Sequence, residues 1–207
     1  DDLNMFSVVP AHCSNLEVLA KGKRGVVFKA QCKGRVVAIK THRPASDAKN
    51  TLLLEAQYLK KVNRLGIGPK LLEAADGYVV MEYVQGVPIG EFLEDALVSK
   101  AVLLIVLAQV FDQLFALDNA QINKFELTNP YKHIIVTPDY KPFLIDFERA
   151  RHSQRPKNIS QFAQYLTSSK VLFLLQSKGI LCDEEKFRKA LKAYQREGTK
   201  FSTDVLL

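Results

Sequence analysis

Cysteine is scarce in this sequence, and its three residues lie far apart. Cys13, Cys32 and Cys182 form no C-x-x-C pair, which argues against a zinc site or a set of disulfides. The pattern predicts reduced thiols and a cytoplasmic protein. The chain opens on Asp1-Asp2, with no basic segment before an apolar run, so no signal peptide is predicted.

Long uninterrupted apolar runs are absent as well. The most hydrophobic stretch, 101–117, is interrupted by Gln109, Asp112 and Gln113, which favours a buried helix over a membrane span. No membrane partner is therefore expected. The 207 residues are 47% hydrophobic and 25% charged, which is typical of a globular chain with one large domain or two small lobes.

Acidic residues are missing from residues 18–46, where eight lysines and arginines occur. The net charge of +7 agrees with this and points to an anionic partner, such as a nucleotide, RNA or a ribonucleoprotein, or a phosphoprotein. A basic face that is simply solvated is the alternative. Charge alone does not choose between them.

The first 45 residues alternate short apolar runs with breaks that contain glycine. This pattern predicts three antiparallel strands at 16–19, 26–31 and 35–41, with Lys33-Gly34 as a tight turn. Gly22 and Gly25 fall in the first loop, where the lack of a Cβ would let backbone N–H groups approach a polyphosphate. No G-K-[ST] follows, so this is not a Walker A loop.

Lys40 follows four apolar residues at the end of the third predicted strand. The following segment, 47–66, is expected to form a helix capped by Asp47, with Glu55 in a largely apolar part of it. An unpaired carboxylate there would be unfavourable, so an ion pair with Lys40 is predicted. The alternative is a glutamate that faces water.

These features, in this order, resemble the protein-kinase superfamily. Ala20-x-Gly22-x-x-Gly25-x-Val27 resembles the glycine loop with its first glycine replaced, Val-Ala-Ile-Lys40 resembles the strand that holds the phosphate-binding lysine, and Asp146-Phe147-Glu148 resembles D-F-G with glutamate replacing glycine. No A-P-E motif follows. Over about 16–150, the resemblance is to compact atypical kinases: the RIO type, the small kinase subunit of the tRNA threonylcarbamoyladenosine machinery, and predicted archaeal serine/threonine kinases.

This resemblance implies an α+β, bilobal protein-kinase-like fold. Residues 1–84 would form an N-lobe of antiparallel sheet plus one helix, and 85–207 a compact, mostly helical C-lobe. The expected cofactors are ATP and Mg²⁺, with Asp146 as a metal ligand and, with Lys40, a catalytic residue. The implied nucleotide-binding residues are Gly22, Gly25, Val27, Ala38, Lys40, Glu55, Met81, Glu82 and Val84.

The catalytic loop departs from the family pattern. Glu126, followed by Leu127, stands where the resemblance expects the catalytic aspartate. The segment between Glu126 and the apolar pair Ile134-Ile135 is two residues longer than in the family pattern. The second metal ligand could be Asn129 or His133. His133 could equally be a packed residue at a strand start.

The expected function is an atypical Mg-ATP-dependent kinase that phosphorylates serine or threonine of a protein, including itself. Two alternatives stay open. The altered loop fits a nucleotide-binding pseudokinase that acts as a partner or RNA-associated module, and the fold is shared with small-molecule phosphotransferases. Glu148 is expected to pair with Arg149 or Arg151, or else to join Asp146 at the metal.

Overall fold

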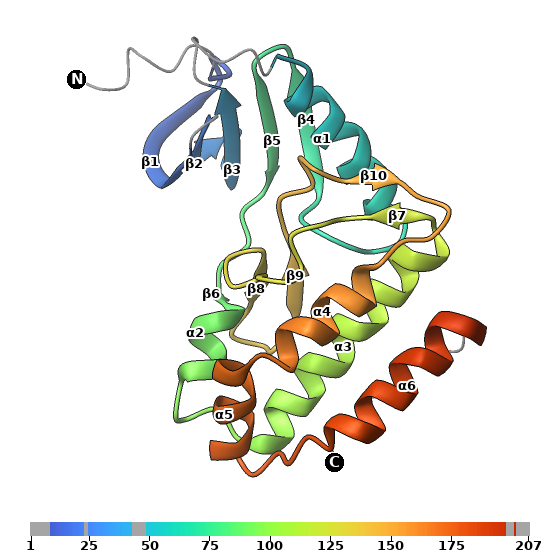
Figure 1. The fold of residues 1–207 in the computed structure, drawn as a ribbon. Helices are drawn as coiled ribbons and strands as arrows, with labels where there is room; N and C mark the ends of the chain where they lie inside the picture. Colours follow the sequence, from blue (N-terminus) through green and yellow to red (C-terminus); the bar gives the residue numbers. More distant parts are fainter. Residues whose placement is uncertain (1–8, 23–24, 43–48, 198–200, 202–207) are drawn as a thin grey trace. The chain divides into compact units, whose positions relative to one another are not determined.

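The chain has an α+β fold. The structure is a computed structural model that describes residues 9–22, 25–42, 49–197 and 201, and within them an antiparallel five-stranded sheet and six helices (Figure 1). It divides into two compact units. Unit 1 consists of Asp1–Val84 with Asp146–Arg149, and unit 2 of Gln85–Ile145 with Ala150–Leu207.

Unit 1 is built on the five-stranded sheet, whose strand order is β1-β2-β3-β5-β4. Lys33 and Gly34 both have positive φ, 51° and 77°, as a two-residue type I′ hairpin turn requires, so the predicted turn and strands are confirmed. The elements are β1 (Cys13–Lys21), β2 (Gly25–Cys32), β3 (Arg35–His42), α1 (Lys49–Asn63), β4 (Leu71–Ala75) and β5 (Tyr78–Glu82). Asp47, the predicted cap of α1, lies outside the described residues.

Alternation along β2 and β3 separates the two faces of this sheet. Val26 and Phe28 on β2 and Ile39 on β3 are fully buried in one apolar cluster. Because side chains alternate along a strand, Val27 and Lys40, which are register partners, face the opposite side. The apolar cluster therefore lies on one face of the sheet, and Lys40 lies on the other.

The prediction that all the thiols are reduced is wrong for two of the three. Cys13 and Cys32 form a disulfide, because the antiparallel register of β1 and β2 sets them opposite each other with their Cα atoms 4.3 Å apart. Sequence separation cannot reveal such pairing before the register is known. The cysteine content therefore no longer supports the expected cytoplasmic location.

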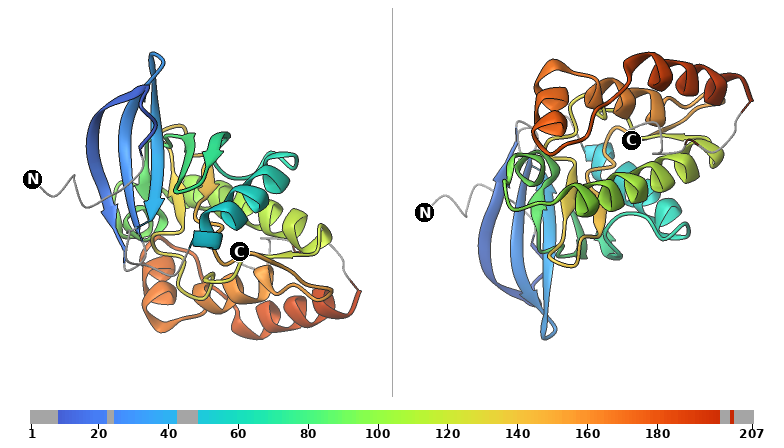
Figure 2. Two further views of the ribbon diagram at one scale, coloured as in Figure 1. Left: turned by 90° about the horizontal axis from the view of Figure 1, so that it is seen from above. Right: turned by 90° about the horizontal axis from the view of Figure 1, so that it is seen from below.

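Unit 2 is mostly helical. Its longest helix, α3, has eight buried residues, and α4 and α6 lie alongside it (Figures 1 and 2). The elements are β6 (Val87–Pro88), α2 (Ile89–Glu94), α3 (Lys100–Asn119), β7 (Ile122–Asn123), β8 (Ile134–Val136), β9 (Pro142–Leu144), β10 (Arg151–His152), α4 (Asn158–Leu166), α5 (Ser169–Ser177) and α6 (Glu184–Glu197). Strands β6, β8 and β9 form one small sheet, and β7 and β10 another.

The sequence predicts two helices in the C-terminal segment, near 159–178 and 183–197, and the structure differs from this in the first of them. The structure breaks it into α4 and α5 at Thr167 and Ser168. The hydroxyl groups of both residues donate to carbonyl oxygens of α4, at 3.1 Å and 2.7 Å, and so satisfy the last turn of that helix. Such local side-chain bonds compete with continuation of a helix.

Helix α3 is also the one helix among the described residues that is long and apolar enough to cross a membrane, judged by length and composition. The same property is expected of a helix buried in a protein core. Leu103, Leu107, Val110 and Leu114 on this helix are all fully buried against the rest of the chain.

Buried Tyr165 on α4 predicts a loss of stability at alkaline pH. Burial raises the pKa of its phenol to about 12. Between pH 10 and pH 12 the unfolded chain loses this proton and the folded chain keeps it, so folding is disfavoured as the pH rises. Denaturation of wild type and Tyr165→Phe across this range should show the wild type losing about 1–2 kcal/mol more, a modest value because water near the site screens the charge. An identical pH dependence of the two proteins would contradict this.

Candidate functional site

Three carboxylates surround the ammonium group of Lys40. Its Nζ lies 2.7 Å from Glu55 Oε2, 3.0 Å from Asp146 Oδ1 and 3.2 Å from Glu148 Oε2. Lys40 and Glu55 have side chains that are only 14% and 3% exposed, whereas Asp146 is 34% exposed. All four residues belong to unit 1, and they are called the Lys40 cluster below.

The packing of α1 on the sheet explains how Lys40 and Glu55 come together. Lys40 stands near the end of β3, on the face opposite the apolar cluster. Helix α1 packs against β3, β4 and β5, with Leu52 and Leu59 almost fully buried. Glu55 lies one turn from each on the helix and so shares the buried side of α1. The predicted pairing of Glu55 with Lys40 is what the structure contains.

The charges of the cluster influence one another strongly. Burial raises the pKa of the Glu55 carboxyl, and the nearby negative charges of Asp146 and Glu148 raise it further, against the opposing effect of Lys40. Burial lowers the pKa of Lys40, but the attraction of Glu55 and Asp146 outweighs it, and the pKa of Lys40 is raised overall. Lys40 is therefore a fixed positive charge under all ordinary conditions.

Asp146 comes directly after the chain leaves unit 2. Strand β9 ends at Leu144, and Ile145 N donates to His133 O at 2.9 Å. Asp146 therefore lies just beyond the end of β9. It has a φ of 62°, in the left-handed region, and such backbone strain in a non-glycine residue is often found at functional sites.

Glu148 also belongs to the cluster and lies beside Asp146 there. The sequence predicts two alternatives for it, a pair with Arg149 or Arg151 or a place with Asp146 at a metal, but not the ion pair with Lys40 that the structure contains. The Glu148 side chain is 14% exposed.

The two glycines of the first loop have different roles. A Cβ on Gly25 would lie 2.1 Å from Thr41 O, so the close approach of β2 to β3 requires glycine at this position. A Cβ on Gly22 would meet nothing closer than 3.6 Å. Gly22 N donates to Gly25 O at 2.8 Å, closing the turn. Sheet packing alone therefore explains the glycine at position 25. Its presence is weaker support for a phosphate-binding loop than the sequence pattern indicates.

The residues predicted to line a base pocket share one face of the sheet. Ala38 is the register partner of both Met81 on β5 and Lys29 on β2, and Val27 is the partner of Lys40. Ala38 and Met81 are buried, and Val27 is half-buried. These residues adjoin the Lys40 cluster along the strands.

The segment that follows Met81 is partly committed to internal bonds. Glu82 is exposed, but its N–H donates to Lys70 O at 2.8 Å. The Glu82 N–H is therefore not available to bind a base. The prediction that the backbone of residues 82–84 binds a base now concerns the Glu82 carbonyl and Val84, which is half-buried just beyond the strand. Lys29 Nζ lies 5.2 Å from the centre of the Tyr83 ring in the same region.

The residues predicted for the catalytic loop, Glu126, Asn129 and His133, all belong to unit 2. Glu126 and His133 are half-buried, and a carboxylate oxygen of Glu126 lies within 4.8 Å of a ring nitrogen of His133. Asn129 is exposed and lines a pocket of about 360 Å³ with Thr128, Tyr131 and Lys170. Glu126 and His133 are thus neighbours, and Asn129 faces a separate cavity.

The backbone around Glu126 is unusual. Phe125 and Glu126 have φ values of 65° and 58°, two successive non-glycine residues in the left-handed region. The next residue is anchored, since Leu127 is fully buried and its N–H donates to Gln161 Oε1 at 3.3 Å. Strain of this kind is kept only where the surroundings impose it, and it marks the loop as a candidate for function.

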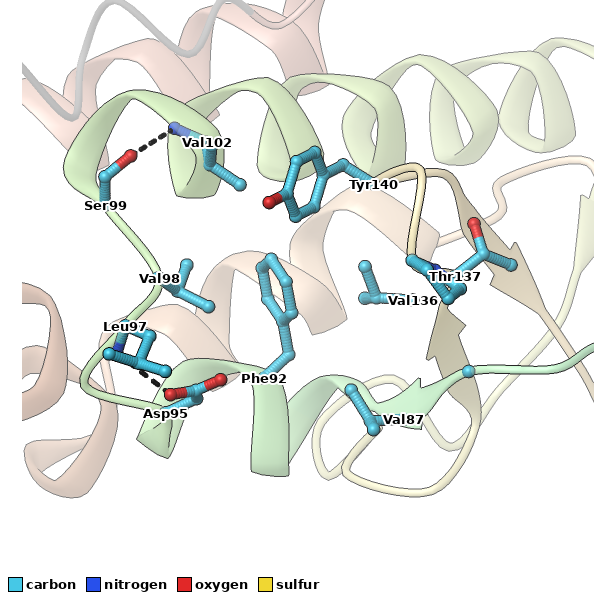
Figure 3. A pocket seen from close by; sticks show the side chains of 12 residues that line it. Val87, Phe92, Asp95, Leu97, Val98, Ser99, Val102, Val136, Thr137 and Tyr140 are labelled. Carbon is cyan, nitrogen blue, oxygen red and sulfur yellow. Dashed lines mark hydrogen bonds between the residues drawn. The ribbon is translucent and has the colours of Figure 1, made fainter.

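A second pocket in unit 2 contains none of the predicted site residues. It measures about 290 Å³, and Figure 3 shows the apolar side chains of Phe92, Val98, Val102 and Val136 pointing into it. The Asp95 carboxylate at its rim accepts a hydrogen bond from Leu97 N at 2.9 Å. Its lining offers packing surface but no cluster of catalytic side chains.

The Lys40 cluster has a donor set that suits a hard cation. One oxygen each from Glu55, Asp146 and Glu148 lie within 4.8 Å of one another, and carboxylate oxygens are the ligands that Mg²⁺ prefers. Lys40 beside them is suited to hold a phosphate oxygen. The three carboxylates could therefore hold a divalent metal ion.

Comparison with known proteins adds no identification. No protein-family model matches this sequence, and a search of curated proteins finds no significant match.

Proposed function

We propose that this protein is an atypical Mg-ATP-dependent kinase that phosphorylates serine or threonine of a protein, and that its two units are the lobes of a protein-kinase-like fold. The observation that carries the proposal is the Lys40 cluster. The carboxylates of Glu55 and Asp146, which are far apart in sequence, both lie within 3.0 Å of the Lys40 ammonium group. The resemblance to the kinase motifs implies that these same three residues bind ATP and Mg²⁺ together.

Each member of the cluster has a defined task in this proposal. Lys40 holds phosphate oxygens of ATP, and Glu55 orients the ammonium group from the buried side. Asp146 and Glu148 are the residues that would hold Mg²⁺. When bound there, the metal would supply positive charge that offsets the negative charge developing during transfer. Val27, Ala38 and Met81 supply an apolar surface for the base.

The proposed reaction transfers the γ-phosphoryl group to a hydroxyl. A new P–O bond forms to the serine or threonine oxygen, the bond from phosphorus to the β,γ-bridging oxygen breaks, and ADP leaves. Glu126 accepts the hydroxyl proton. The loose transition state of phosphoryl transfer demands little of its base, so a glutamate in place of an aspartate is chemically adequate.

A nucleotide-binding pseudokinase is the second candidate function. It is favoured by the catalytic loop, where Glu126 replaces the expected aspartate and the segment before Ile134 is lengthened. Misplacement by about 1 Å can lower a rate 10²-fold. On this alternative the Lys40 cluster binds nucleotide, no transfer follows, and the basic charge of the chain serves an RNA or protein partner.

One set of measurements separates these functions. The protein is incubated with γ-labelled ATP and Mg²⁺, alone and with acceptor proteins, beside Glu126→Gln. We expect label on serine or threonine, and a fall of about 10²-fold or more in the variant. Stabilisation by nucleotide without transfer would support the pseudokinase. Label that appears only on an added small alcohol would support a small-molecule phosphotransferase. RNA binding that weakens with salt and ignores nucleotide would favour the basic-surface explanation.

A further inference from the structure

Glu148 places a third carboxylate next to Lys40, where the D-F-G pattern that the segment resembles has no side chain. The contact with Nζ is 3.2 Å, and the Glu148 side chain is as buried as that of Lys40. Its backbone N–H lies 3.4 Å from Asp146 Oδ1 as a donor. The carboxylate is therefore held within the cluster and is not a mobile surface group.

The number of carboxylates matters because an ammonium group has three N–H donors. Three carboxylate oxygens lie within 3.2 Å of Lys40 Nζ: Asp146 Oδ1 accepts a hydrogen bond from it, and Glu55 Oε2 and Glu148 Oε2 form ion pairs with it. A phosphate oxygen that approached Lys40 would compete with these carboxylates for the ammonium group. Glu55 is 3% exposed and cannot move into water, so the exchangeable contacts are those of Asp146 and Glu148.

Charge adds to this competition. When all three carboxylates are ionised, the cluster carries two more negative than positive charges, and a polyphosphate would be repelled at close range in a poorly solvated site. A divalent cation reverses the balance. It would take Asp146 and Glu148 as ligands, and Lys40 would then have donors available for phosphate.

We propose that Glu148 makes nucleotide binding conditional on a divalent cation, by occupying Lys40 until the cation draws it away. This inference rests on the proposed function, because it concerns the same site. It assigns Glu148 as a positioning residue and a metal ligand. The simpler possibility, that Glu148 only stabilises the fold through its ion pair, makes different predictions for binding.

The test measures affinity for a non-hydrolysable ATP analogue by calorimetry, in EDTA and in excess Mg²⁺. Wild type is compared with Glu148→Gln and Glu148→Gly, and with Glu73→Gln as a control carboxylate on β4 that lies outside the cluster. Thermal unfolding confirms that each variant is folded. Wild type should bind at least about 100-fold more tightly with Mg²⁺ than in EDTA.

Both Glu148 variants should bind the metal-free analogue about tenfold or more tightly than wild type, and they should gain less from Mg²⁺. Glu73→Gln should behave as wild type. If wild type binds with Mg²⁺ but the Glu148 variants show unchanged metal-free affinity, the role of Glu148 is refuted while nucleotide binding stands. If no protein binds the analogue in either condition, the nucleotide-binding proposal fails together with this one.

Discussion

Replacement of Lys40 by methionine is expected to lower phosphoryl transfer about 10²–10³-fold and to destabilise unit 1 at the same time. The first effect follows from the proposed function, in which the positive charge of Lys40 contacts the phosphates of ATP. The second follows because Glu55, 3% exposed, is left as a buried carboxylate without its nearest cation. Breaking a buried ion pair by removing one partner lowers the free energy of unfolding by about 3–5 kcal/mol.

The destabilisation should depend on pH with a definite sign. Burial already raises the pKa of Glu55, and Lys40 opposes that rise, so removing Lys40 raises the pKa further. A carboxyl group whose pKa is raised in the folded state destabilises the fold when the pH rises above its pKa in the unfolded chain, which is about 4.3 for glutamate. The stability difference between wild type and Lys40→Met should therefore shrink as the pH is lowered toward that value, as urea denaturation would measure.

A double variant separates the two effects of Lys40. In Lys40→Met with Glu55→Leu, the buried pair is replaced by apolar side chains, which is often neutral or stabilising. Stability should return to within about 1 kcal/mol of wild type, while transfer remains lost. A Lys40→Met protein that keeps both its stability and its transfer activity would mean that the Lys40 cluster is not the site.

The central features of the site could be predicted from sequence because they depend on local patterns. Lys40 ends an apolar strand, and Glu55 occurs in the apolar part of a helix, so each is unusual in its own segment. A buried charge needs a partner of opposite sign, which links the two without knowledge of the fold. Asp146, a carboxylate after an apolar run, is assigned its role only by the resemblance of Asp146-Phe147-Glu148 to D-F-G.

Features that depend on register or on close packing could not be predicted. The disulfide of Cys13 and Cys32 needs the β1–β2 register, and the steric need for Gly25 needs the position of the Thr41 carbonyl. The ion pair of Glu148 with Lys40 joins residues that are far apart in sequence, so a local pattern does not reveal it. The break between α4 and α5 depends on hydroxyl groups that bond backward to α4. Each error came from contacts that a one-dimensional pattern does not contain.

The largest structural effect outside the cluster is expected in unit 2, at a buried polar network that joins α3, β7, α4 and α6. Asn158 is fully buried at the start of α4. Its Nδ2 donates to Asp118 Oδ1 and to Ile122 O, both at 2.6 Å, and its Oδ1 accepts from Lys124 N at 2.7 Å. Tyr194 OH, on α6, donates to the other oxygen of Asp118 at 2.6 Å.

Asp118 also accepts hydrogen bonds from buried backbone amides at the start of α4. The backbone N–H groups of Asn158 and Ile159 donate to its two oxygens, at 3.2 Å and 3.4 Å. These amides are among those that a helix cannot satisfy internally, and a negative charge at this end also favours the helix dipole. One aspartate from α3 thus caps α4 and binds α6, so loss of its partner Asn158 should weaken several contacts together.

Asn158→Ala should lower the free energy of unfolding of unit 2 by about 3–4 kcal/mol, because it leaves a buried carbonyl, a buried amide and part of a buried carboxylate without partners. Tyr194→Phe, which removes one bond, should lower it by about 1–2 kcal/mol. Ser99→Ala, at the exposed cap of α3, should lower it by about 0.5–1 kcal/mol. Circular dichroism during urea denaturation provides the signal, since the chain has no tryptophan. The order of the three effects is the decisive result: if Asn158→Ala is no more damaging than Ser99→Ala, the network does not hold these elements together.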